Sequence, residues 1–226
     1  MGSKRRIAKD ILPIILKNRK EGQWYVEPFV GGGNIIDKVD GNRIGSDVNE
    51  YLIALLIKMQ SSCFYPPFVG EIKYKEIQNN KDKYSKWLVG YVGFNLSFGA
   101  KFFGGYGRDK AGVRDYENEA QQNLKAQQND INGIIFKNCT YDKLEIPYNS
   151  IIYCDPPYES TTKYRNKFNH DEFWQWCRKK KSEGHEIYIS EYNAPKDFIC
   201  VWQKEITSSL TKDTGAKKGI EKLFTI

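Results

Sequence analysis

Apolar residues follow different patterns in three stretches of the chain. Up to about residue 60, and again from about residue 133, short apolar runs alternate with segments in which apolar residues recur every three or four positions. Over 61–132 this alternation stops, and glycines, prolines and aromatic residues become frequent. Strands that alternate with helices are typical of an open, mostly parallel α/β sheet. We therefore expect an α/β domain formed by residues 1–60 and 133–226, with residues 61–132 as an inserted subdomain.

The outer stretches define the elements of the expected sheet. Ile7, Ile11 and Ile15 have helical spacing, and Asn49 is a suitable helix cap before a stripe of leucines. The expected elements are a helix over 4–20, a strand over 24–30 that ends at three glycines, a helix beginning at 34, a strand over 43–47, a helix over 49–60, strands over 134–137 and 150–154, a helix over 171–182, and strands over 186–190, 198–206 and 222–226. Within the insert, 115–128 has the pattern of a polar helix.

The composition narrows the classes of function. The 226 residues include 35 Lys and Arg against 28 Asp and Glu, and the net charge of +7 favours an anionic partner such as nucleic acid. The longest apolar runs are far shorter than the ~20 residues of a membrane span. The basic N-terminus lacks the apolar core of a secretory signal. We therefore expect no membrane partner and a cytoplasmic location.

Cysteine and histidine are too sparse for metal chemistry. The five cysteines are scattered without any C-x-x-C pair, and there are only two histidines. Such cysteines are typical of free thiols in a reducing compartment rather than of a zinc site. The sequence therefore predicts no metal, and it leaves the chemistry to carboxylates, backbone groups or a bound cofactor.

Possible ligand-binding residues follow the first two expected strands. In EPFVGGG (27–33), the glycines allow the backbone to approach a ligand closely, although their spacing differs from the dinucleotide fingerprint G-x-G-x-x-G. Asp47 ends the second strand, and its carboxylate is suited to accept hydrogen bonds from ribose hydroxyls. Taken singly, an ordinary glycine-rich turn and a surface aspartate explain these residues equally well.

The most specific motif, Asp155-Pro156-Pro157-Tyr158, follows an apolar strand. Two successive prolines fix their φ angles and remove two N–H donors, which leaves a stiff loop whose carbonyls are free to face a substrate. Asp155 and a carbonyl can together accept both hydrogens of an exocyclic amine, and Tyr158 offers a flat face for stacking on a base. Ligands of α/β sheets bind beyond the carboxyl ends of strands, where this motif is expected to lie.

The order EPFVGGG, Asp47, DPPY resembles that of the Dam-type (D12 class) N6-adenine-specific DNA methyltransferases. The resemblance extends over nearly the whole chain, because GSKRRIAKDILPII (2–15), ISEYNAP (189–195) and KKGIEKLFTI (217–226) are also similar to family segments. It implies a Rossmann-like sheet that uses S-adenosylmethionine, with a target-recognition insert between its two main motifs.

The resemblance also implies roles in cofactor binding. Lys4 would face the carboxylate side of S-adenosylmethionine, Asp47 its ribose, and Asp155 would lie close to it as well. The methionine end would be held by Glu27, Pro28, Phe29, Gly31 and Gly33. The adenine ring would be flanked by Thr140, Tyr141 and Asp142.

The implied reaction is direct methyl transfer to the N6 amine of an adenine flipped out of duplex DNA. The Asp155 carboxylate and the Pro156 carbonyl would accept hydrogen bonds from N6 in the loop that Pro157 stiffens, and Tyr158 would stack on the base. No covalent enzyme intermediate is needed, so Cys154 is expected to be a packed strand residue.

The insert is expected to bind double-stranded DNA. Its aromatic residues, Phe94, Phe98, Phe102, Phe103 and Tyr106 among them, are expected mostly to form a core of their own. The candidates for phosphate or base contacts are Lys101, Arg108, Lys110 and Arg114.

Two other functions are compatible with the sequence. One is a methyltransferase that acts on an RNA amine or a protein glutamine, whose relatives more often carry Asn in place of Asp155. The other is a DNA-binding module that has lost catalysis. For the leading interpretation we expect a monomer or weak dimer in a bacterial or phage-infected cell, acting alone or in restriction–modification.

Overall fold

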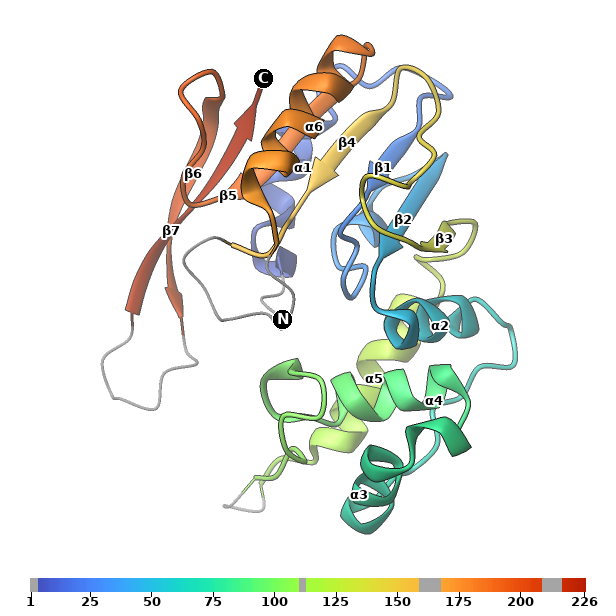
Figure 1. Ribbon diagram of the computed structural model, residues 1–226. Coiled ribbons are helices and arrows are strands. Elements are labelled where there is room, and N and C mark those ends of the chain that lie inside the picture. The colour runs from blue at the N-terminus through green and yellow to red at the C-terminus, as the bar shows by residue number, and fades with distance from the viewer. Residues whose placement is uncertain (1–3, 110–112, 159–167, 209–216) are drawn as a thin grey trace.

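The computed structural model describes residues 4–109, 113–158, 168–208 and 217–226, and its architecture is mixed α/β (Figure 1). The described helices are α1 (Ala8–Ile15), α2 (Glu50–Met59), α3 (Glu71–Asn79), α4 (Lys86–Gly90), α5 (Tyr116–Gln128) and α6 (His170–Ser182), with short helical turns at Lys4–Arg6, Ile36–Lys38, Lys81–Lys83, Tyr91–Asn95 and Phe98–Ala100. The described strands are β1 (Tyr25–Glu27), β2 (Arg43–Asp47), β3 (Ile135–Asn138), β4 (Ile151–Cys154), β5 (Glu186–Glu191), β6 (Ile199–Ser208) and β7 (Lys217–Thr225).

The described strands form one sheet in the order β3-β2-β1-β4-β5-β7-β6. Neighbours from β3 to β5 are parallel, and β7 is antiparallel to both β5 and β6. From β1 the chain proceeds to β2 and β3 on one side, whereas from β4 it proceeds to β5 on the other. The order of connection therefore reverses between β1 and β4, the position at which open α/β sheets bind ligands. The predicted Rossmann-like sheet is confirmed.

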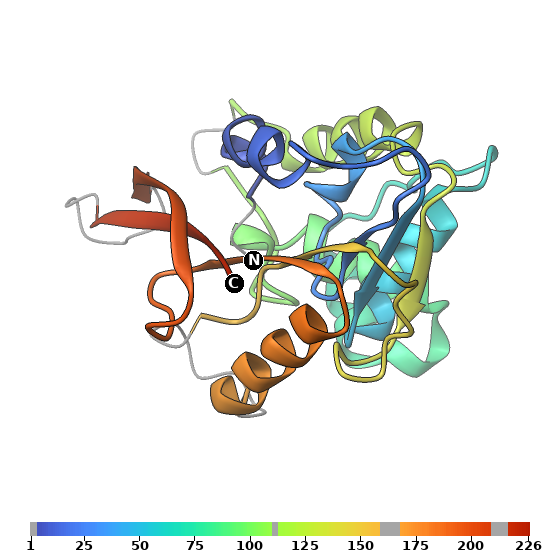
Figure 2. The same cartoon turned by 90° about the horizontal axis from the view of Figure 1, so that it is seen from above.

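Apolar side chains alternate between the two faces of the sheet, as the pleat of a strand requires. In each of four adjacent pairs, the first residue packs with α1 and α2 and the second packs with α6: Tyr25 and Val26, Ile151 and Ile152, Tyr153 and Cys154, Leu223 and Phe224. Figure 2 shows α1 and α6 on opposite sides of the sheet. Cys154 is fully buried, as expected of a packed strand residue.

Residues 61–132, which we call the helical segment, contain α3, α4 and α5 and lie beyond the edge at which β2 and β4 end (Figure 1). Buried side chains of these helices belong to the same apolar cluster as those of α1 and α2. The contact between α4 and α2 is close at Gly90, where a Cβ atom would lie 2.2 Å from the Tyr51 carbonyl oxygen. The helical segment therefore shares one apolar core with the helices α1 and α2 on one face of the sheet.

Aromatic rings pack together within the helical segment, as predicted. The described ring contacts have centroid distances of 4.8 Å for Phe94–Phe102 and Phe102–Phe103, and 5.4 Å for Tyr74–Phe103 and Tyr74–Tyr106. Phe98 is an exception to the predicted core, because it is 65% exposed.

Several expected elements are wrong in extent, among them the strand expected over 222–226, which begins already at Lys217 in β7. The strand expected over 24–30 is limited to β1, because Pro28 has no N–H donor with which to continue the ladder. The helix expected from 34 is a single 3₁₀ turn, because the chain reverses at Gly41 (φ 74°) before entering β2. The helix expected over 4–20 is a 3₁₀ turn followed by α1, which ends at Ile15.

Candidate active site

Three acidic residues stand at the carboxyl ends of neighbouring strands. Glu27 is the last residue of β1, Asp47 is the last residue of β2, and Asp155 directly follows β4. Because these strands lie in the order β2-β1-β4, the sheet brings the three predicted clusters to one edge. This edge faces the helical segment (Figure 1).

A glycine loop, residues 28–33, turns back from β1 over the end of β2. Val30 N donates a hydrogen bond to Ser46 O at 2.8 Å, and this bond anchors the loop on β2. Gly31 and Gly33 have φ angles of 52° and 70°, in the left-handed region that favours glycine. The glycines therefore give the loop a shape that other residues would adopt only with strain.

The Asp47 carboxylate fixes this loop through backbone groups. Its Oδ2 accepts a hydrogen bond from Gly31 N at 3.2 Å, and its Oδ1 accepts one from Asn49 N at 2.9 Å. Burial raises the pKa of Asp47, while these N–H groups oppose the rise. Each carboxylate oxygen can accept more than one hydrogen bond, so Asp47 keeps capacity for a ligand hydroxyl.

Glu27 is buried beneath the loop. Its side chain accepts a hydrogen bond from the Tyr25 hydroxyl at 2.9 Å, and the residue is only 3% exposed. Burial raises the pKa of Glu27 well above its usual range. Glu27 is therefore a buried carboxyl group, held by the Tyr25 hydroxyl, whose ionised form is disfavoured by its surroundings.

Lys4 lies among acidic and phenolic groups beside the DPPY loop. Its Nζ donates to Glu221 Oε2 at 2.6 Å and to the Tyr158 hydroxyl, and it lies 3.6 Å from Asp155 Oδ1. Burial lowers the pKa of Lys4, but the charges of Asp155 and Glu221 outweigh this effect and raise it overall. Lys4 is therefore a charged group that connects the N-terminus, β7 and the loop after β4.

Two contacts hold the Tyr158 side chain in addition to Lys4. Its hydroxyl donates to Glu221 Oε2 at 2.8 Å, and its ring packs edge-to-face on Tyr192 with centroids 4.6 Å apart. Tyr192 belongs to ISEYNAP (189–195), so this segment and the DPPY motif meet in the structure.

Asp155 combines burial with neighbouring charges of both signs. Burial raises the pKa of Asp155 to about 6, although Lys4 opposes the rise, and the nearby Glu221 adds to it. The side chain remains 24% exposed. At neutral pH, Asp155 is therefore a carboxylate that is still accessible to a ligand.

The residues expected to flank an adenine ring follow β3. The rings of Tyr141 and Phe29 are stacked with centroids 5.4 Å apart at an interplanar angle of 28°. Thr140 Oγ1 is buried without a hydrogen-bond partner among the described residues, and Asp142 is exposed. The structure thus brings the loop after β3 against the glycine loop.

The basic candidates of the helical segment have different surroundings. Lys101 is exposed, Arg108 donates a hydrogen bond to Glu71, and Arg114 donates to both carboxylate oxygens of Glu119 at 2.9 and 2.6 Å. Lys110 lies outside the described residues. Any phosphate contact of Arg108 or Arg114 would therefore compete with a carboxylate partner.

Sequence reasoning missed Glu221 as a site residue. It is 6% exposed in β7 and contacts Lys4, which lies 217 positions earlier in the chain. A signal was present, because Glu221 shares a strand face with the fully buried Leu223. An acidic residue on a buried strand face needs a partner, and Lys4 supplies it.

The topology and the loops at the strand ends define a Rossmann-like α/β fold with its candidate site at the switch point. The family model described as D12 class N6 adenine-specific DNA methyltransferase matches residues 1–87 and 67–221. The chain therefore belongs to this family, as the sequence predicted.

Two further comparisons accompany this match. No curated protein matches the chain. Among solved structures, the chain is similar to SMU.472, described as "a putative methyltransferase complexed with SAH", at 11% sequence identity and a TM-score of 0.39. The matched region covers 98% of this chain and 52% of that one, so the chain spans about half of that protein's length.

Membership in a methyltransferase family points to S-adenosylmethionine as the cofactor. Across the described residues, no group of three or more His, Cys, Asp or Glu side chains is arranged to hold a metal ion. All five cysteines are free thiols. None of the described helices is long and apolar enough to cross a membrane.

Proposed function

We propose that this protein transfers a methyl group from S-adenosylmethionine to the N6 amine of an adenine in duplex DNA. The observation that carries the proposal is the position of the DPPY loop, which follows β4 directly across the switch point from the glycine loop after β1. Family membership supports adenine N6 in DNA as the acceptor.

The nucleoside part of the cofactor fits the residues beyond β2 and β3. Thr140 Oγ1, buried without a hydrogen-bond partner among the described residues, suits a polar atom of a nucleoside. The aromatic side chain of Tyr141 suits an adenine ring, and Asp47 suits ribose hydroxyls. These residues favour a ligand that carries an aromatic base and a sugar.

The methionine part of the cofactor is assigned to the glycine loop and its surroundings. Glu27, Pro28, Phe29, Gly31 and Gly33 belong to a tight turn of backbone with the buried Glu27 carboxyl group beneath it. The ammonium group of Lys4 would attract the cofactor's carboxylate, although Glu221 and Asp155 already contact it. When bound, the cofactor supplies an electrophilic methyl group.

The DPPY loop is assigned to the acceptor base. The lone pair of adenine N6 is delocalised into the ring, which makes the amine a poor nucleophile. Hydrogen bonds from N6 to the Asp155 carboxylate and the Pro156 carbonyl favour its nucleophilic form and stabilise the positive charge that develops on it. Tyr158, held by Glu221 and Tyr192, would stack on the base and offset ~1–3 kcal/mol of the cost of flipping it.

Residues 61–132 are assigned to target recognition, and residues 1–60 and 133–226 to cofactor binding and catalysis. The helical segment lies beyond the strand ends that carry the candidate site (Figure 1), so DNA bound to it would face the loop that follows β4. Lys101, Arg108, Lys110 and Arg114 are the proposed DNA-contacting residues.

The pH dependence of methyl transfer should follow the ionisation of Asp155. Because its pKa is about 6 in the folded protein, the hydrogen-bond-accepting carboxylate is present above that pH and is lost below it. We expect kcat/KM to fall about tenfold per pH unit below about pH 6, and circular dichroism at each pH would verify that the protein stays folded. A rate at pH 5 equal to that at pH 7.5 would contradict this role of Asp155.

The salt dependence of DNA binding should identify the phosphate contacts. We expect Lys101→Ala to weaken binding and to lower the slope of log K against log salt concentration by about 1. Arg108→Ala should have a similar effect, reduced by the competing Glu71. Lys179→Ala on α6, whose side chain is 72% exposed, is the matched control and should leave the slope unchanged. Unchanged slopes for Lys101→Ala and Arg108→Ala would place the DNA elsewhere.

The substrate class can be tested in one assay. The protein is incubated with methyl-labelled S-adenosylmethionine and, in separate reactions, with duplex DNA, RNA or protein extract. We expect label in DNA. Label in RNA or protein but not in DNA would overturn the proposal in favour of a methyltransferase for an RNA amine or a protein glutamine.

A further inference from the structure

Gln127 is one of two polar residues, with the buried Glu117, on the mostly apolar stripe that runs along α5 and the turn after it. Ala120, Leu124 and Ile131 are buried and recur at helical spacing, and Gln127 occupies the position of this stripe between Leu124 and Ile131. An amide at such a position faces the core side of the helix, so it needs hydrogen-bond partners there.

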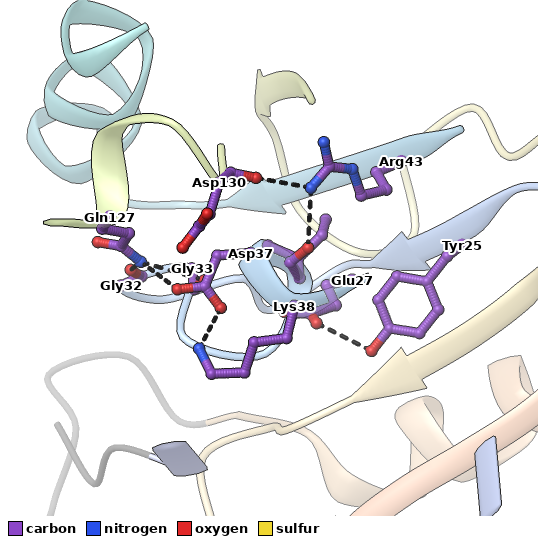
Figure 3. A network of polar contacts seen from close by, with 10 residues as sticks. Tyr25, Glu27, Gly32, Gly33, Asp37, Lys38, Arg43, Gln127 and Asp130 are labelled. Atoms are coloured by element: carbon purple, nitrogen blue, oxygen red, sulfur yellow. Dashed lines mark hydrogen bonds and ion pairs between the residues drawn. The ribbon is translucent and has the colours of Figure 1, made fainter. Parts of the chain in front are cut away.

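The partners of Gln127 are supplied by the glycine loop and by the helical turn that follows it, Ile36–Lys38. Its Nε2 donates to Gly32 O at 3.0 Å, to Gly33 O at 3.2 Å and to Asp37 Oδ2 at 3.0 Å (Figure 3). The two hydrogens of the amide thus serve three acceptors. These bonds join the helical segment to the glycine loop and the turn after it, 90 to 95 positions earlier in the chain.

The Asp37 carboxylate and the carbonyls of Gly32 and Gly33 have few described hydrogen-bond donors besides the Gln127 amide. The Asp37 side chain is 6% exposed, and its other described partner is Lys38 Nζ at 2.5 Å. Gly33 adopts a left-handed conformation, and Asp37 N closes the turn by donating to Gly33 O at 3.2 Å. Loss of the Gln127 amide would leave a largely buried carboxylate and two carbonyls with fewer donors, a situation that favours rearrangement of the loop.

A second contact fixes the end of the helical segment on β2. The Arg43 guanidinium donates to Asp130 O at 2.8 Å and to Asn132 O at 2.7 Å, as Figure 3 shows in part. Arg43 begins β2, so the turn after α5 is attached to the same sheet that carries the glycine loop. The end of α5 is thus held by two contacts, one from Gln127 to the glycine loop and one from Arg43 of β2 to the turn after the helix.

We propose that Gln127 is a positioning residue of the cofactor site. It holds the glycine loop in the shape that binds the methyl donor, and through it the helical segment contributes to cofactor affinity. This inference rests on the proposed function, because it takes the glycine loop as part of the cofactor site. Gln127 itself acts through the carbonyls of Gly32 and Gly33 and need not touch the cofactor.

The test is the affinity for S-adenosylhomocysteine, measured by isothermal titration with the full chain. We expect Gln127→Ala to weaken binding about tenfold, the equivalent of about one net hydrogen bond. Gln127→Glu should weaken it further at pH 7.5, because a carboxylate has no N–H and would face Asp37 and two carbonyls. The matched control is Gln128→Ala, which removes a neighbouring amide that donates to Ser61 O at 2.8 Å and not to the loop.

Steady-state kinetics distinguish positioning from a loss of folded protein. Gln127→Ala should raise KM for S-adenosylmethionine and leave kcat at saturating cofactor nearly unchanged, whereas a loss of folded protein would lower the apparent kcat without changing KM. If the unsubstituted protein binds S-adenosylhomocysteine and both Gln127 variants bind it equally well, the inference is wrong. If the unsubstituted protein does not bind it, the proposed function is wrong instead.

Discussion

Replacing Asp155 with asparagine is expected to lower kcat of methyl transfer by about 10²- to 10³-fold, the size of effect seen when one preorganised hydrogen-bonding group is removed from an active site. Asparagine keeps the shape of the side chain but replaces the negative charge with a neutral amide. It therefore removes the charge that favours the nucleophilic form of N6. Cofactor-dependent label transfer to DNA, at saturating cofactor, measures the effect.

Although Asp155→Asn should lower activity, it should leave the stability of the folded protein unchanged or raise it. Folding raises the pKa of Asp155 to about 6, so above that pH the ionised side chain is less favourable in the folded protein than in the unfolded chain. The neutral Asp155→Asn variant avoids this cost, and its melting temperature at pH 7.5 should be equal to or higher than that of the unsubstituted protein. Asp197→Asn, in which a surface carboxylate paired with Arg178 is changed, is the control and should keep full activity. Near-normal turnover of Asp155→Asn would contradict the catalytic assignment.

Replacing Gly90 with alanine is expected to destabilise the protein by about 3 kcal/mol, the upper range for overpacking a close contact. The added Cβ would lie 2.2 Å from the Tyr51 carbonyl oxygen, and backbone cannot yield as a flexible side chain can. Tyr51 lies in α2, which directly follows the sheet strand β2. To relieve the clash, α4 would have to move away from α2. Urea unfolding followed by circular dichroism measures the change.

Gly70→Ala is the matched control for this substitution. Gly70 precedes α3 with φ −64°, and a Cβ there would approach nothing closer than 3.8 Å, at Phe68. Its free energy of unfolding should change by less than about 1 kcal/mol. Equal stabilities for the Gly90→Ala and Gly70→Ala variants would show that α2 and α4 do not pack as closely as described.

Local signals in the sequence were enough to predict several elements. The strand expected over 43–47 coincides with β2, and α2 begins after Asn49, whose side chain accepts hydrogen bonds from Tyr51 N and Leu52 N as a helix cap does. The polar helix expected over 115–128 is α5, with Asp115 as its cap. In each case, the residues that determine the element lie within or next to it.

The expected elements were wrong in extent where contacts with distant parts of the chain determine the local structure. The sequence around 34 is compatible with a helix, but the chain must return to β2 within a few residues, and the loop is held instead by Gln127 from α5. β6 and β7 are longer than their apolar runs, because their pairing with one another extends both strands.

The site was predicted in part for the same reason. The motifs at the ends of β1, β2 and β4 could be expected to form one site, because the carboxyl ends of parallel strands lie at the same edge of a sheet. Glu221 and Gln127 were missed because their contacts join positions 217 and 95 residues apart. The contacts of Lys4 with Asp155 and Tyr158 depend equally on the folded chain.

Identification of the methylated nucleoside tests the central claim most directly. Duplex DNA is incubated with the protein and S-adenosylmethionine, digested to nucleosides and analysed by mass spectrometry, with Asp155→Asn as the parallel control. The predicted result is N6-methyldeoxyadenosine in the reaction of the unsubstituted protein and little or none in that of the variant. Methylated cytosine in place of methylated adenine, or equal N6-methyldeoxyadenosine in both reactions, would contradict the proposed role of the DPPY loop.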